Sequence, residues 1–146
     1  MPHWRSGRPL PRTATYRENS KMTCETVCMS DHHHGFGREV MEELAPLGRD
    51  VREKIPGVYA GYGEMHKAAF AEGELSKKMK ELIALAIAIT THCDGCISAH
   101  ARGAALAGAT EEEVAEMVGV TISMNGGPGT VYGPRAFAAF REYKNK

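Results

Sequence analysis

The residues of this chain best suited to chemistry are two thiols, Cys93 and Cys96, followed four residues later by His100. Thiols three residues apart on a helix have Cα atoms about 5–6 Å apart, which a disulfide tolerates. At the start of a helix, free backbone N–H groups and the helix dipole favour the thiolate. His100 can reach the sulfur of Cys96 at i,i+4 and act as its base. The spacing predicts a dithiol redox centre.

A carboxylate upstream completes this set of residues. Glu81 shares a helical stripe with Ile89 and His92, on the segment that leads to the two cysteines. Glu81 could orient or recharge His100, directly or through a water, as the third member of a triad does. The alternative is an exposed ion pair with Lys77 or Lys78, worth only about 0.3–0.5 kcal/mol.

Local reasoning leaves the choice of nucleophile open, since the helix start favours Cys93 and the histidine at i,i+4 favours Cys96. A zinc site would need two further ligands, and His92 and His100 are available. However, His92 adjoins Cys93 and cannot easily share its coordination tetrahedron, and there is no second Cys-x-x-Cys. The redox interpretation is therefore favoured, and no metal or cofactor is assigned.

The composition describes an ordinary soluble protein with one domain. The 146 residues include 18 basic and 18 acidic side chains, so no nucleic-acid partner is indicated. The longest apolar run, Leu82–Ile89, is far shorter than the about 20 residues that a membrane helix needs. Four cysteines in two close pairs do not make a secreted disulfide scaffold. The prediction is a cytoplasmic protein with one working dithiol.

The beginning of the chain differs in composition from the rest. Residues 1–35 are rich in Pro and Arg and show no helical or strand period, so we predict a disordered extension before a domain over residues 36–146. Cys24 and Cys28 lie in this extension and are not expected to be catalytic. His32–His34 could capture a metal only adventitiously.

The domain itself has the apolar spacing of helices. A first helix is predicted from Phe36, with Pro46 limiting or kinking it. A second helix covers residues 56–73, with proline at its start and Gly73 at its end. Ser76 is the predicted N-cap of a third helix that runs to about Thr90. Because this third helix is apolar all round, we expect it to be buried in the core.

The second half of the domain is helical as well. Thr91 or Asp94 is expected to cap a fourth helix, and Thr110–Glu113 has the pattern of a capping box for a fifth. Residues 125–129 are predicted to be a break, with a last helix after Pro134. No segment alternates as a strand does, and no repeat has a solenoid period. The predicted fold is all-α.

Several of these stretches together resemble a known family. They are Lys80-Glu81-Leu82, Cys93-Asp94-Gly95-Cys96-Ile97-Ser98-Ala99-His100, the run from Ala104 to Glu113, Pro56-Gly57 with Tyr62 and Phe70, and the run from Asn125 to Pro134. Over roughly residues 37–143 the chain resembles the alkylhydroperoxidase D-like branch of the carboxymuconolactone decarboxylase family. The resemblance implies a compact domain of about six to seven helices that forms homo-oligomers, often trimers or hexamers.

The resemblance also assigns a role to each site residue. It implies that Cys96 is the attacking thiolate and Cys93 the resolving thiol, which decides between the two local arguments. His100 is then the base, and Glu81 belongs to the proton relay. The implied activity is thiol-dependent reduction of hydroperoxides, with a dithiol electron donor that in such relatives is a lipoyl-bearing protein.

One position departs from the pattern of the family. Its best-studied members carry a further histidine between the two cysteines, where this chain has Gly95. His92 is nearby and is the candidate to replace it. The departure bears on both the proton relay and the identity of the electron donor.

Three functions are weighed against one another. The leading one is a peroxidase of the peroxiredoxin type, in which a sulfenic acid condenses with the second thiol to a disulfide. A decarboxylase of the muconolactone type is suggested by the name of the broader family, but that chemistry needs no dithiol. The third is a helical oligomer without enzymatic activity, whose dithiol senses redox state or braces a helix junction.

Overall fold

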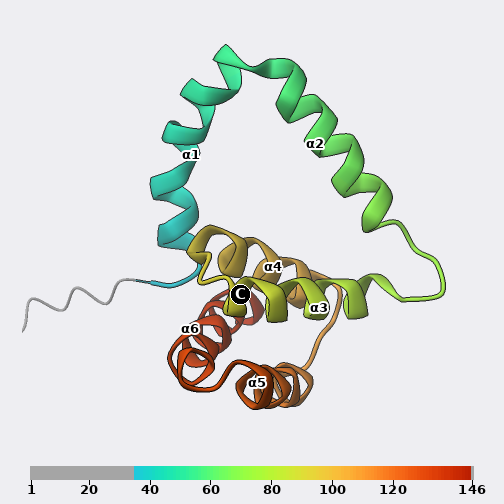
Figure 1. Ribbon diagram of the computed structural model, residues 1–146, viewed down its shortest axis with the longest axis vertical. Coiled ribbons are helices and arrows are strands. Elements are labelled where there is room, and N and C mark those ends of the chain that lie inside the picture. Colours follow the sequence, from blue (N-terminus) through green and yellow to red (C-terminus); the bar gives the residue numbers. More distant parts are fainter. Residues whose placement is uncertain (1–34, 146) are drawn as a thin grey trace, which may run out of the picture. The chain divides into compact units, whose positions relative to one another are not determined.

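The computed structural model describes residues 35–145, and this part of the chain contains six α-helices and no strand. The all-α prediction is therefore confirmed. The helices are α1 (Arg38–Lys54), α2 (Pro56–Ala69), α3 (Lys77–Thr90), α4 (Asp94–Leu106), α5 (Glu111–Asn125) and α6 (Gly127–Lys144) (Figure 1). The predictions about the first 34 residues, which include Cys24, Cys28 and His32–His34, lie outside the described residues.

Four helices, α3 to α6, enclose the hydrophobic core. Their fully buried side chains include Leu85 and Ile89 from α3, Ile97 from α4, Val114 from α5 and Phe140 from α6. Removing a large apolar side chain of this kind from water contributes about 1.5–3 kcal/mol. The core thus fixes α3 and α4 against each other, and the junction of these two helices carries both cysteines.

The expectation that α3 is buried on all sides is wrong. Leu85 and Ala88 are buried, but the side chains of Ile83 and Ile87 are 43% and 57% exposed. The reason is that α3 packs against α4, α5 and α6, whereas the backbone of α2 does not come close enough to cover its remaining face. The apolar residues on that face line open hollows in the surface.

Two helix starts are as predicted, because the interactions that fix them are local. The Ser76 hydroxyl accepts a hydrogen bond from the backbone N–H of Met79 at 3.2 Å and caps α3. The Thr110 hydroxyl accepts from the Glu113 N–H, and the Glu113 carboxylate accepts from the Thr110 N–H, which completes the capping box of α5.

Two prolines lie inside helices that were expected to stop or start near them. α1 continues through Pro46 to Lys54, and α6 contains Pro134 seven residues after its first residue, Gly127. A proline removes the hydrogen bond to the carbonyl four residues earlier. Both prolines are exposed, so water can reach the carbonyl that is left free. A solvent-facing proline therefore does not end either helix.

The break before α6 is confined to Gly126, whose φ of 63° lies in the left-handed region. Two glycines of α6, Gly129 and Gly133, serve the close packing of α6 on α5. A Cβ on Gly129 would lie 2.9 Å from the Cα of Ile122, and one on Gly133 would lie 2.6 Å from a methyl group of Val118. The glycine-rich run therefore combines one turn with a helix–helix contact.

The end of α2 also differs from the prediction. The helix ends at Ala69 and not at Gly73. The ammonium group of Lys80 on α3 donates hydrogen bonds to the carbonyl oxygens of Ala69 (2.9 Å) and Ala71 (2.5 Å). A cation that binds the last carbonyls stabilises the C-terminal end of a helix.

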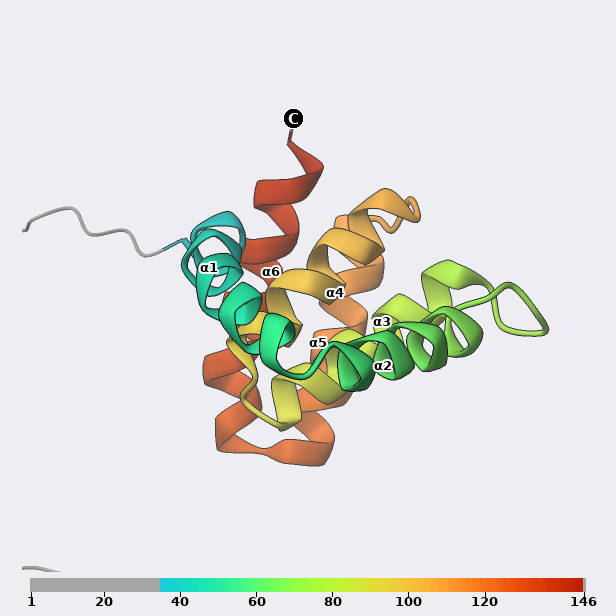
Figure 2. The same ribbon diagram turned by 90° about the horizontal axis from the view of Figure 1, so that it is seen from above.

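The first two helices form a separate feature, which we call the arm (residues 38–69). No residue of α1 or α2 is buried, and among the described helices the backbone of α2 lies within 8 Å of α1 alone. The two helices diverge from their junction at Ile55, and α2 returns toward the start of α3 (Figures 1 and 2). Large apolar side chains along the arm are exposed: Met41, Leu44, Leu47, Val51, Val58, Tyr62 and Met65.

The root of the arm is held by polar contacts from the core helices. The Glu142 carboxylate of α6 accepts hydrogen bonds from the backbone N–H groups of Phe36, Gly37 and Arg38, at 3.0–3.2 Å. The buried Ser98 hydroxyl of α4 donates to the Gly37 carbonyl at 2.6 Å. These contacts supply partners for free N–H groups at the start of α1.

None of the helices in residues 35–145 has the length and hydropathy required to cross a bilayer.

Candidate active site

The two cysteines lie at the start of α4 and are joined by a disulfide, with their Cα atoms 5.2 Å apart. The N-cap of α4 is Cys93 itself, whose sulfur accepts a hydrogen bond from the Cys96 N–H at 3.3 Å. The expectation that Thr91 or Asp94 caps this helix is therefore wrong. The Thr91 hydroxyl donates to the Ile87 carbonyl at 3.0 Å, so it is engaged at the end of α3. A sulfur held at a helix N-terminus is where negative charge is stabilised.

His92 forms the turn that carries the chain from α3 to α4. Its φ of 55° is in the left-handed region, which few residues other than glycine adopt. The next N–H, of Cys93, donates back to the Ala88 carbonyl at 3.1 Å and closes the turn. The imidazole stacks on the Tyr132 ring of α6, with centroids 4.4 Å apart. The structure thus places this ring on α6, and not among the residues that line the pocket beside Cys96.

The structure brings Glu81 and His100 together. The Glu81 side chain is nearly buried, and its Oε2 lies 2.9 Å from Nδ1 of His100. The alternative ion pair at the surface is wrong for both lysines considered: Lys78 pairs with Glu113 at 2.6 Å, and Glu81 faces the interior. An ionised carboxylate only accepts hydrogen bonds, so Nδ1 is the donor and Nε2 is left free to accept a proton.

Gly103 makes the position of this carboxylate possible, and the sequence reasoning missed it. A Cβ on Gly103 would lie 2.6 Å from Oε1 of Glu81 and closer still to Oε2. The Glu81 side chain could move away only by giving up its bond to His100, because it is enclosed by the core. The signal was present in the sequence, since Gly103 follows His100 by three residues and shares its helix face.

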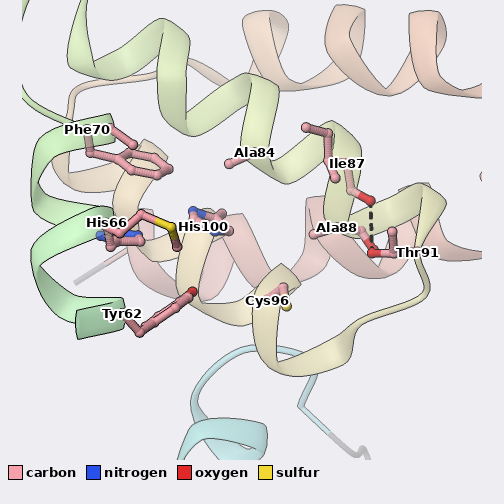
Figure 3. Close-up of a pocket in the computed structure, with 11 residues that line it drawn as sticks. Tyr62, His66, Phe70, Ala84, Ile87, Ala88, Thr91, Cys96 and His100 are labelled. Carbon is pink, nitrogen blue, oxygen red and sulfur yellow. Dashed lines mark hydrogen bonds between the residues drawn. The ribbon is translucent and has the colours of Figure 1, made fainter. Parts of the chain in front are cut away.

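A pocket of about 300 Å³ opens beside Cys96 and His100, between α2, α3 and α4 (Figure 3). Most of its wall is apolar or aromatic. The lining side chains are those of Tyr62, Met65, His66, Ala69, Phe70, Ala84, Ile87, Ala88, Thr91, Cys96 and His100. Cys96 lines this pocket and Cys93 does not. A small apolar molecule in this hollow would therefore meet the sulfur of Cys96 and the imidazole of His100.

The wall contributed by α2 contains a second imidazole, which the sequence reasoning also missed. The His66 ring stacks on Phe70 with centroids 4.3 Å apart, and both rings face His100, at 6.1 Å and 5.4 Å. Tyr62 stands one turn earlier on the same face, 6.1 Å from His66. The i,i+4 spacing of these three aromatic residues was the available signal.

The space at Gly95, between the cysteines, is taken by the arm. A Cβ on Gly95 would lie 2.9 Å from Cδ1 of Leu44 on α1. A large side chain at Gly95 would therefore displace Leu44. At the position where the best-studied family members carry a histidine, this chain therefore has a glycine whose backbone lies against Leu44 of α1.

These features agree with the comparisons to known proteins. The model of the carboxymuconolactone decarboxylase family matches residues 56–142, which is more than half of the chain. The chain therefore belongs to the carboxymuconolactone decarboxylase family, and its likeness to the alkylhydroperoxidase D-like branch is consistent with that membership.

Individual relatives support the same placement. An uncharacterized protein of Cupriavidus necator is 39% identical over 102 residues, which are 70% of this chain and 87% of that protein. A protein named "uncharacterized protein 4 in cox locus", from Paracoccus denitrificans, is 38% identical over 53% of this chain and 70% of its own length. The apo crystal structure of a carboxymuconolactone decarboxylase family protein from Legionella pneumophila is 34% identical, with a TM-score of 0.69 over 72% of this chain and 94% of that one.

Proposed function

We propose that this protein is a thiol-dependent peroxidase of the peroxiredoxin type, which reduces organic hydroperoxides or hydrogen peroxide. The observation that carries the proposal is the Cys93–Cys96 disulfide at a helix start, beside the bonded pair of Glu81 and His100. A dithiol that can close into a disulfide, a base and a carboxylate that orients the base are the parts that this chemistry needs.

The reaction begins at Cys96. Nε2 of His100 takes the thiol proton, and the thiolate attacks the terminal oxygen of the hydroperoxide, ROOH. The O–O bond breaks, the sulfur becomes a sulfenic acid, and the alkoxide leaves as ROH after it takes a proton. Cys93 then attacks the sulfenic sulfur as a thiolate, the disulfide forms and hydroxide leaves as water. Two thiols and one hydroperoxide thus give one disulfide, one alcohol and one water.

The assignment of the two thiols is supported by their surroundings. Cys96 is exposed and lines the pocket together with His100. Cys93 lies outside that lining, and its sulfur is occupied as the cap of α4. These surroundings support Cys96 as the thiol that an incoming peroxide meets and Cys93 as the thiol that resolves the sulfenic acid.

The test is peroxide consumption in the presence of dithiothreitol. The wild-type protein should consume tert-butyl hydroperoxide catalytically, and Cys96→Ser should abolish turnover. Cys93→Ser, reduced and then freed of dithiothreitol, should consume one equivalent and keep a sulfenic acid on Cys96, because no second thiol is there to condense with it. The double substitution Cys24→Ser, Cys28→Ser is the matched control and should leave turnover intact. Unchanged turnover in Cys96→Ser would refute the proposal.

Loss of CO₂ from a muconolactone, retained when both site cysteines are replaced by serine, would favour the decarboxylase instead.

We extend the proposal to partners and location. The electron donor is a dithiol, such as a lipoyl group on a protein, the compartment is the cytoplasm, and the protein acts as a homo-oligomer. The oligomer is supported by the exposed apolar side chains of the arm, because contiguous apolar surface marks interaction sites. Light scattering after size-exclusion chromatography should report a trimer or hexamer, and a monomer at all concentrations would contradict this part.

A further inference from the structure

We propose that His66, on the arm, is a second proton-carrying imidazole of the active site, and that it protonates the alkoxide released when the O–O bond breaks. The inference rests on the proposed peroxidase function and adds a residue from outside the Cys-x-x-Cys segment. It makes α2 part of the catalytic machinery, although none of its residues is buried in the core.

The first observation is the position of His66. It lines the pocket described above together with Cys96 and His100, and it lines an adjoining hollow together with Gly95 and the same two residues. Its side chain is partly buried, whereas the residues on either side of it in α2, Met65 and Lys67, are exposed. Figure 3 shows its ring extending from α2 toward His100.

The second observation is that the ring of His66 is oriented. It is stacked at 12° to the Phe70 ring and lies at 20° to the ring of His100. The titratable groups around it come from three helices: Tyr62 from α2, His100 from α4, and Glu81 from α3, behind His100. His66 is therefore held against the pair that handles the proton of Cys96, with the pocket beside it.

The chemistry of the step gives the second imidazole a task. In the displacement, sulfur, attacked oxygen and leaving oxygen lie approximately in line, so the leaving oxygen is on the side away from the sulfur. A base that has just taken the proton of Cys96 lies on the sulfur side. An imidazole from a different helix can deliver a proton to the leaving oxygen, and general acid catalysis of this kind contributes about 10²–10⁴-fold.

Other histidines of the described chain cannot take this task in the observed arrangement. The ring of His92 is stacked on Tyr132 and lines neither hollow. The Nδ1 atom of His100 is bonded to Glu81, so one ring nitrogen remains, and the proposed function uses that nitrogen to take the proton of Cys96. His66 is the remaining imidazole that shares the pocket with the reacting sulfur.

The experiment compares two oxidants that release different leaving groups when the O–O bond breaks. tert-Butyl hydroperoxide releases a strongly basic alkoxide, which needs a proton. Peracetic acid releases acetate, which is stable without one at neutral pH because carboxylic acids titrate near pH 4. His66→Phe preserves the stacked ring and removes its nitrogens, and His66→Gln keeps polar atoms but replaces the imidazole with an amide that does not act as an acid. The rate of Cys96 oxidation is followed by rapid quenching and titration of the remaining thiols.

The expected result is selective. Both variants should react about 10- to 100-fold more slowly than wild type with tert-butyl hydroperoxide, within the usual range for a lost general acid. With peracetic acid they should stay within about threefold of wild type, since acetate leaves without general acid catalysis. Glu64→Gln, which changes an exposed titratable residue of the same helix, is the matched control and should show no selectivity.

The outcomes separate this inference from the proposed function. Equal losses with both oxidants would mean that His66 only positions the pocket wall, and no loss with either would mean that it is not involved; both results overturn the inference. A wild-type protein that reacts with neither oxidant would overturn the proposed function itself.

Discussion

The helices α2 and α3 have 14 residues each, and they lie on opposite sides of the same pocket. α3 buries five residues, including Leu85 and the catalytic candidate Glu81, whereas α2 buries none. The comparison shows that one pocket can be lined both by a helix held by core packing and by a helix that buries none of its residues. The dithiol and the Glu81–His100 pair depend on the core, and the aromatic wall with His66 depends on the arm.

The largest expected effect is on stability, and the same substitution, Leu→Ala, is compared at a core position and at a position on the arm. Leu85→Ala in α3, at a side chain with 0% exposure, should lower the free energy of unfolding by about 2–5 kcal/mol. Leu47→Ala in α1, at a side chain that is 58% exposed, should change it by less than about 0.5 kcal/mol. Urea denaturation followed by circular dichroism measures both. Both variants are measured at a protein concentration at which the proposed oligomer has dissociated, because a partner on the arm would raise the cost at Leu47. A cost above about 2 kcal/mol at Leu47 in the monomer would contradict the contrast.

A smaller effect is expected at the contact between Glu81 and α4. Gly103→Ala should cost about 1–3 kcal/mol through overpacking and should slow peroxide consumption, because the carboxylate must leave His100. Gly119→Ala in α5 is the matched control: a Cβ there meets nothing within 4 Å, so the protein should be stabilised by about 0.5–1 kcal/mol. Adding Glu81→Asp to Gly103→Ala shortens the carboxylate and should restore part of the rate. Equal behaviour of the two alanine variants would contradict the role given to Gly103.

The smallest effect concerns the capping box of α5. The two helices of the arm have no such box, because the N-cap residues of α1 and α2 make no side-chain capping hydrogen bond. Hydrogen bonds from the Lys78 ammonium and the Thr110 backbone N–H lower the pKa of Glu113. Because the folded pKa is below the unfolded one, the contribution of Glu113 to stability is fully present above the unfolded pKa. It is lost as the pH falls through the folded pKa.

Stability measured between neutral pH and pH 3 tests this point. Lys78→Gln should reduce the acid-dependent part of the unfolding free energy, and Thr110→Ala should cost about 1 kcal/mol at neutral pH. Lys77→Gln, on the same turn of α3, is the control for a change in net charge. An identical pH profile for Lys78→Gln and wild type would contradict the assigned cause of the lowered pKa.

The features that the sequence predicted well are those that depend on neighbours along the chain. Ser76 and the Thr110–Glu113 box cap their helices as expected, since the partner N–H groups lie within three residues. Glu81 lies on the helical stripe that leads to the cysteines, and His100 follows Cys96 by four residues, so the sequence suggested that Glu81 orients His100. The structure brings these two side chains together. Their roles in catalysis remain predictions.

Features that depend on where other helices run were not predicted. The tolerance of Pro46 and Pro134 follows from their exposure, which apolar spacing does not reveal. The place of Leu44 against Gly95, and that of His66 beside His100, depend on the path of the arm. The N-cap at Cys93 escaped notice because Ser, Thr, Asp and Asn are the usual capping residues.

The contacts of Glu142 also have a consequence for the order of folding. This carboxylate reaches back across 104 to 106 residues to bind the N–H groups that precede and begin α1. Closing so long a loop is entropically costly, and it cannot be rewarded until α6 exists to present the carboxylate. Among the described helices, the first along the chain, α1, therefore obtains a partner for its N-terminal N–H groups only once the last, α6, has been synthesised.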